Sequence, residues 1–113
     1  MESVVAEFLS YLTDEAGLSP NTTEAYKRDL QKFLEYLNSR AVNDIRKIRP
    51  SDAEGFLSRY GTGHSSRSVA RMASSLRTFA RFAVESGYIK NSFMRHSPRL
   101  KVGVRLPETL SEE

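Results

Sequence analysis

The chain has 113 residues, of which 39% are hydrophobic and 27% are charged, as in an ordinary globular protein. Because it contains no cysteine, a disulfide scaffold and a cysteine metal site are both excluded. No apolar run approaches the ~20 residues that a membrane helix needs, and the N-terminal stretch is too acidic for a signal peptide. These features predict one small domain in the cytoplasm, without a membrane partner.

The net charge of +3 is distributed unevenly along the chain. Residues 1–63 carry a net charge of −2, residues 64–105 carry +8, and residues 106–113 carry −3. Charge of one sign concentrated in one block most often indicates an anionic partner, such as nucleic acid or an acidic surface.

The first predicted helix covers about residues 2–16. Gly17, followed by Leu18, predicts its end, because glycine adopts the left-handed C′ conformation without strain. The apolar stripe of this helix consists of Val4, Val5, Phe8, Leu9 and Leu12.

The second predicted helix begins after Ser19, a plausible N-cap, with Pro20 at the first helical position, and it extends to about Ser39. Its apolar stripe consists of Tyr26, Leu30, Phe33 and Leu37.

A connector, residues 41–50, precedes the third predicted helix. That helix begins near Ser51, which has capping-box spacing to Glu54, and it ends in the sequence GTG, residues 61–63. Ser65 or Ser66 can cap the fourth helix, and Gly87 predicts its end. From Pro98 onward the pattern is that of an extended linker or tail. No strand alternation of any length occurs, so the predicted fold class is all-α.

The fourth predicted helix has two opposed faces when its residues are placed at 100° intervals. Its apolar face consists of Val69, Met72, Leu76, Phe79, Ala80 and Ala83. The opposite face consists of Arg67, Arg71, Ser74, Thr78 and Arg81, with Ser75 at its edge and Arg77 nearer the boundary.

The simplest interpretation of the polar face is that it is solvated, but two features argue against this. A solvated face usually alternates charges to gain i,i+4 pairs of ~0.2–0.5 kcal/mol, whereas these arginines have no acidic residue at that spacing before Glu85. The intervening Ser and Thr are poorer helix formers, yet they allow a partner to approach closely. Arginines separated by small donors suit a phosphate backbone and a major groove.

The second predicted helix adds polar and basic residues at its N-terminal end and on its outer face, where the helix dipole favours phosphate. Lys27 falls at the margin of the apolar stripe, Arg28 on the outer face, and Lys32 extends the basic edge. The candidate DNA-binding residues are Asn21, Thr23, Lys27, Arg28, Ser66, Arg67, Arg71, Ser74, Ser75, Arg77, Thr78 and Arg81.

Three ordered motifs resemble the core-binding domain of tyrosine recombinases, most closely the Xer type. The second helix of that domain is matched by Leu18, Ser19, Thr23, Tyr26, Arg28, Asp29, Leu30 and Phe33. Its fourth helix is matched by Arg71, Ser74 or Ser75, Leu76, Arg77, Phe79, Gly87 and Asn91. The family's proline after that asparagine is replaced here by Ser92. The sequence RLPETLSEE, residues 105–113, is similar to the interdomain linker and the first residues of the catalytic domain.

The resemblance implies a compact orthogonal bundle of four main helices, a SAM-like domain formed by two crossing helical hairpins. It implies a core-binding domain, residues 1–97, followed by the linker and the start of an absent catalytic domain, residues 98–113. The implied partners are double-stranded DNA and, for the full-length protein, a second copy or a paralogous recombinase in a synaptic tetramer. No metal or cofactor is implied. Family members resolve chromosome or plasmid dimers or integrate mobile elements, and they act at the nucleoid.

The catalytic residues of such recombinases are absent from this chain, so we expect a fragment that binds DNA without catalysing strand exchange. Two His-x-x-Arg sequences, His64 to Arg67 and His96 to Arg99, fit the family's catalytic box by spacing alone. The first is expected at a helix cap, and Pro98 blocks a helix through the second.

Two other functions remain as alternatives. A basic helical module could bind an acidic protein or a membrane through its basic face. A stand-alone helix-turn-helix regulator could bind DNA, although the gap GTGHSS between the third and fourth helices exceeds the usual turn of roughly 3–4 residues.

Overall fold

The computed structural model describes residues 1–94, and the linker and tail expected from residue 98 onward lie outside this range. Every regular element in residues 1–94 is helical, which confirms the all-α prediction. The elements are α1 (Glu2–Asp14), α2 (Pro20–Ser39), the short 3-10 helix η1 (Ile45–Lys47), α3 (Pro50–Gly61) and α4 (Ser66–Glu85).

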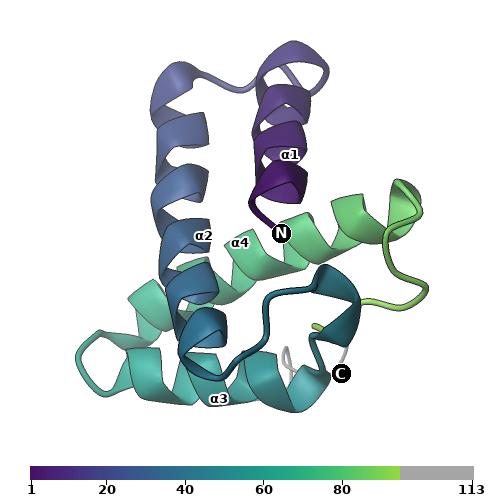
Figure 1. The fold of residues 1–113 in the computed structure, drawn as a ribbon. Coiled ribbons are helices and arrows are strands. Elements are labelled where there is room, and N and C mark those ends of the chain that lie inside the picture. The colour runs from purple at the N-terminus through teal and green to yellow at the C-terminus, as the bar shows by residue number, and fades with distance from the viewer. Residues whose placement is uncertain (95–113) are drawn as a thin grey trace, which may run out of the picture.

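The four α-helices form two antiparallel hairpins that cross steeply (Figure 1). One hairpin consists of α1 and α2, and the other of α3 and α4. Helix α4 packs against both α1 and α2, while α3 also contacts α2. This is the orthogonal bundle that the family resemblance implied. No helix within residues 1–94 has the length and apolar character needed to cross a membrane.

The apolar stripes predicted from the sequence meet in one core. Phe8 of α1, Phe33 of α2 and Phe79 of α4 are all completely buried. The ring of Phe33 also contacts Phe56 of α3 and Phe93, with centroid distances of 5.2 and 5.7 Å. The segment after α4 therefore returns to close the core, a contribution that the sequence pattern did not predict.

The N-terminal ends of the two long helices follow the sequence prediction. Ser19 caps α2, since its hydroxyl accepts the backbone N–H of Thr22 at 3.2 Å, and Pro20 occupies the first position. Of the two cap candidates for α4, Ser65 is the N-cap, and its hydroxyl accepts the backbone N–H of Ser68 at 3.2 Å.

The start of α3 lies within one residue of the position predicted near Ser51, but the predicted capping box of Ser51 and Glu54 was wrong. Helix α3 begins at Pro50, because proline's fixed φ and missing N–H suit the first helical position. Arg49 is the N-cap, and its backbone N–H donates to the Asp52 carboxylate at 2.9 Å. Asp52, at the third helical position, therefore supplies the capping carboxylate in place of Glu54.

The prediction for the end of α1 was also wrong. Helix α1 ends at Asp14 with Glu15 as its C-cap, so Gly17 lies beyond the C′ position that was assigned to it. Gly17 still has a positive φ of 70°, and the following Leu18 N–H donates to the Leu12 carbonyl at 3.0 Å. The glycine thus belongs to a wider turn into α2.

The turn between α3 and α4 is shorter than predicted, because it consists only of residues 62–65. This length falls within the roughly 3–4 residues usual for a helix-turn-helix. Turn length therefore no longer argues against that alternative.

Gly87 ends α4 as predicted. Its φ is 85°, its N–H donates to the Val84 carbonyl at 3.1 Å, and the Tyr88 N–H donates to the Ala83 carbonyl at 2.9 Å. This pair of bonds is a Schellman motif, which requires the left-handed conformation at the glycine.

We expect Gly87→Ala to lower the free energy of unfolding by about 1–2 kcal/mol, because a Cβ is strained at positive φ. Urea denaturation measures this change. Gly63→Ala is the matched control, since Gly63 lies in a turn at ordinary φ with open space where its Cβ would be. Equal effects of the two substitutions would contradict the assignment of strain to Gly87.

Candidate nucleic-acid interface

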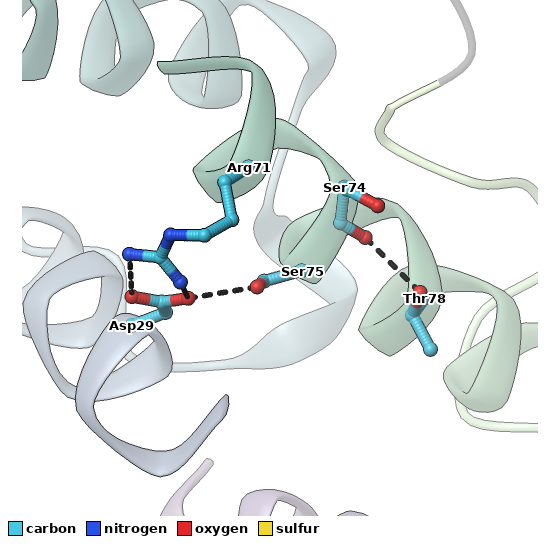
Figure 2. A network of polar contacts seen from close by, with 5 residues as sticks. All are labelled: Asp29, Arg71, Ser74, Ser75 and Thr78. Carbon is cyan, nitrogen blue, oxygen red and sulfur yellow. Dashed lines mark hydrogen bonds and ion pairs between the residues drawn. The ribbon is translucent and has the colours of Figure 1, made fainter. Parts of the chain in front are cut away.

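Helices α2 and α4 are joined by a polar cluster around Asp29, shown in Figure 2. The Arg71 guanidinium of α4 donates two hydrogen bonds to the Asp29 carboxylate, Nη1 to Oδ2 at 2.7 Å and Nη2 to Oδ1 at 3.2 Å. The Ser75 hydroxyl, also on α4, donates to Oδ2 at 2.8 Å. One carboxylate of α2 is thus held by two side chains of α4.

Helical spacing explains how these three residues meet. Asp29 precedes Leu30 at the edge of the apolar stripe of α2, so its side chain lies where that helix meets its neighbour. Arg71 and Ser75 are four residues apart and share one edge of α4. The contact fixes where the two helices cross.

The cluster has a buried side and an exposed side. The Asp29 side chain is 4% exposed and the Arg71 side chain is 54% exposed. A buried carboxylate is costly unless it is paired and hydrogen-bonded, and here three donors satisfy it. The hydrogen bonds to Asp29 are the main cause that raises the pKa of Arg71 above its usual value.

Asp29 was not among the candidate site residues, although the family motif included it. Asp29 lies on another helix, 42 positions from Arg71 in the sequence, so the i,i+4 spacing within α4 does not reveal this pair. The available signal was a carboxylate directly beside a buried leucine of the apolar stripe, since such a group needs a partner from another element.

Several predicted residues of α2 and α4 lie on the outer surface. On α4, Arg67, Ser74 and Arg81 are exposed, and on α2, Asn21 and Arg28 are exposed. Thr78 is half-buried, and its hydroxyl donates to the Ser74 backbone carbonyl at 3.0 Å (Figure 2).

Four predicted residues lie elsewhere around their helices. The Thr23 hydroxyl is 3.5 Å from that of Thr13 on α1, and Lys27 lines a groove between α1 and α2. Arg77 and Ser66 both lie away from Arg71 around α4, by about 120° for Arg77. The Arg77 Nε is buried without a hydrogen-bond partner.

An aromatic pair lies at the turn between α3 and α4. The Tyr60 and His64 rings stack at a centroid distance of 3.8 Å, and Lys32 Nζ lies 5.6 Å from the centre of the Tyr60 ring. His64 Nδ1 is 2.7 Å from the Tyr60 carbonyl oxygen, which can only accept, so Nδ1 is the donor of this hydrogen bond. His64 is therefore part of a turn and lies outside any helix, unlike the family's His-x-x-Arg box. His96 lies outside the described residues.

The described residues contain no group of three or more acidic or histidine side chains able to hold a metal ion. The chemistry of this surface consists of guanidinium groups, hydroxyls and one stacked aromatic pair. Guanidinium groups and hydroxyls of this kind bind anions and base edges.

Comparison with known proteins identifies related sequences. The family model described as the phage integrase N-terminal SAM-like domain matches residues 5–87. The protein named tyrosine recombinase XerD from Listeria monocytogenes serotype 4b is 34% identical over 113 residues, covering 98% of this chain and 38% of that protein. The one from Staphylococcus aureus is 32% identical over 114 residues, with the same coverage. This chain thus spans 38% of the length of these relatives. No solved structure gives a significant match.

Proposed function

The chain belongs to the family of phage integrase N-terminal SAM-like domains, and on this premise we propose that it is the DNA-binding domain of a site-specific tyrosine recombinase. The proposal is supported by the contact between Asp29 of α2 and Arg71 of α4, together with the exposure of Arg28 on α2 and of Arg67 and Arg81 on α4. Two helices held in this way offer their exposed arginines to the same duplex, with the exposed Glu24 and Glu35 also on α2.

The individual residues have different roles in this proposal. Arg28, Arg67 and Arg81 are exposed and suit phosphate oxygens, with Asn21 and Ser74 as additional donors. Ser75 is buried and acts indirectly, since it holds Asp29 against Arg71. A major groove about 12 Å wide admits one helix, so α4 with its small outward side chains is the element for the groove.

The proposal extends to the domain boundaries of the chain and to the full-length protein. Residues 1–97 form the core-binding domain, and residues 98–113 form the linker and the start of a catalytic domain that supplies the nucleophilic tyrosine. Helices as far as residue 85 and the buried Phe93 and Met94 support the first boundary. We propose that the full-length protein acts at the nucleoid, with copies of itself or of a paralogue.

Duplex binding should show a strong salt dependence. If the surface neutralises ~5 phosphates, the logarithm of the association constant should fall with the logarithm of salt concentration at a slope of about −4 to −5. Fluorescence anisotropy with a labelled 30-base-pair duplex at several salt concentrations measures it. Absence of binding at the lowest salt concentration would contradict the proposal.

The same titration separates DNA recognition from general attraction to polyanions. A basic module for acidic proteins would bind heparin and duplex DNA with similar slopes. A DNA-binding domain should favour the duplex, because the directed donors around the α2 and α4 crossing fit its regular phosphate spacing.

The alternative of a stand-alone helix-turn-helix regulator is tested by which residues along α4 are needed for duplex binding. Such a protein contacts bases with the N-terminal residues of its recognition helix. Loss of Arg81, sixteen positions from the N-cap at Ser65, should then have little effect. The proposed domain instead uses the length of α4 together with α2.

A further inference from the structure

We propose that Asp29 determines sequence specificity by converting Arg71 from a mobile charge into a directed hydrogen-bond donor for a base edge. The inference rests on the proposed DNA-binding function and extends it to a residue that does not itself reach the surface. It assigns different roles to arginines of the same helix.

The first argument is geometric. The two hydrogen bonds that Nη1 and Nη2 of Arg71 donate to Asp29 hold the guanidinium plane at that edge. A guanidinium has five N–H donors, so its Nε–H and one N–H on each terminal nitrogen are not used by Asp29. Because 54% of the Arg71 side chain is exposed, the guanidinium group that Asp29 fixes is accessible to a partner, with the Tyr60 side chain beside it.

The second argument concerns what fixes Asp29. Its carboxylate is buried, and the Ser75 hydroxyl binds the same Oδ2 atom that accepts from Arg71. Arg71 and Ser75 belong to one helix, so α4 orients the carboxylate that in turn orients its own arginine (Figure 2). Such preorganisation lowers the conformational entropy lost when a base is bound.

The third argument concerns charge. A paired arginine attracts a distant phosphate less than a free one, because the adjacent carboxylate cancels most of its field. Among residues 1–94, Arg67 and Arg81 form no ion pair, and they remain the source of attraction to any sequence. Arg71, whose positive charge is balanced by Asp29, instead favours a base edge that matches its remaining donors, such as the two acceptors of guanine.

The decisive variant is Asp29→Asn, which keeps the shape of the side chain and removes its charge. Each variant is tested by selection from a randomised 20-base-pair duplex pool, followed by salt titrations with the duplex selected by the wild-type chain and with the unselected pool. For Asp29→Asn we expect tighter binding to the pool, a salt slope steeper by about 1, and a selected-to-pool affinity ratio at least about 10-fold lower.

Asp44→Asn is the matched control. Asp44 is also paired with an arginine, Arg46, at 3.1 Å, and its substitution changes the net charge equally. That pair lies at η1, away from the crossing of α2 and α4. The control should leave the selected-to-pool ratio within about 2-fold of the wild type, since distant sites act independently.

Arg71→Lys provides a second variant that keeps a cation opposite Asp29 and therefore preserves the buried pair. Lysine lacks the planar fork, so the ratio should fall while the salt slope stays at the wild-type value. Circular dichroism confirms that each variant is folded, and if Asp29→Asn is unfolded, Arg71→Lys decides the question.

The inference is overturned if both folded variants keep the wild-type ratio, or if they weaken selected and pooled duplexes equally, as a purely structural role requires. It is also overturned if the wild-type chain binds duplexes without sequence preference, in which case the proposed function stands. A wild-type chain that binds no duplex overturns both.

Discussion

Replacing Phe8 by alanine should lower the free energy of unfolding by about 3–5 kcal/mol, the range for truncation of a fully buried phenylalanine. Phe8 is completely buried, and its ring contacts those of Tyr26, Phe79 and Phe82 at centroid distances of 5.8, 5.3 and 5.4 Å. These rings come from α2 and α4, so the substitution leaves a cavity where three helices meet. A domain of this size has only about 5–15 kcal/mol of stability to lose.

Urea denaturation followed by circular dichroism measures this loss. The control is Ser10→Ala on the exposed side of α1, which should change the free energy of unfolding by less than about 0.5 kcal/mol. Phe8→Leu should restore part of the lost stability, because it refills most of the cavity. A loss below about 1.5 kcal/mol for Phe8→Ala would show that α1 does not pack into the core as described.

The fold was largely predictable because it depends on patterns within short stretches of sequence. Apolar residues at helical spacing identified the core faces, and Ser19 with Pro20 placed the start of α2 correctly. The errors fell at positions where two local signals competed. Both Asp52 and Glu54 could supply a capping carboxylate for α3, and only the position of Pro50 in the folded helix decides between them. Such competition leaves helix ends uncertain by one or two residues.

The sequence predicted which arginines share the exposed face of α4, and it did not predict the contacts that these residues make with other helices. Arg67, Arg71 and Arg81 were identified because one face of one helix concentrates their charge. The bond from Arg71 to Asp29 depends on how α2 and α4 cross, and the sequence periodicity of either helix contains no information on that crossing angle. For the same reason Lys27 was grouped with the arginines, although it lines the groove toward α1.

Removal of two exposed arginines together, Arg67→Ala with Arg81→Ala, should weaken duplex binding by at least about 100-fold at low salt, since each charged hydrogen bond contributes about 1.5–3 kcal/mol. The salt slope should become shallower by about 2, because two fewer phosphates are neutralised. Neither residue contributes to the core, so the free energy of unfolding should remain within about 0.5 kcal/mol for each substitution. Anisotropy titrations with the 30-base-pair duplex measure both quantities.

The control for this double substitution is Arg46→Ala with Lys90→Ala, which lowers the net charge by the same amount. Both residues line a separate groove formed by η1, the start of α3 and the segment after α4. If duplex binding reflected only the net charge of the chain, the two double substitutions would weaken it equally. If the duplex binds across α2 and α4, the Arg67 and Arg81 substitutions should make the salt slope shallower by about 2. The Arg46 and Lys90 substitutions should change the slope by less than about 1, because only phosphates in direct contact release their counterions. Equal changes of slope for the two double substitutions would place the duplex elsewhere on the molecule. They would also contradict the roles proposed for Arg71 and Asp29.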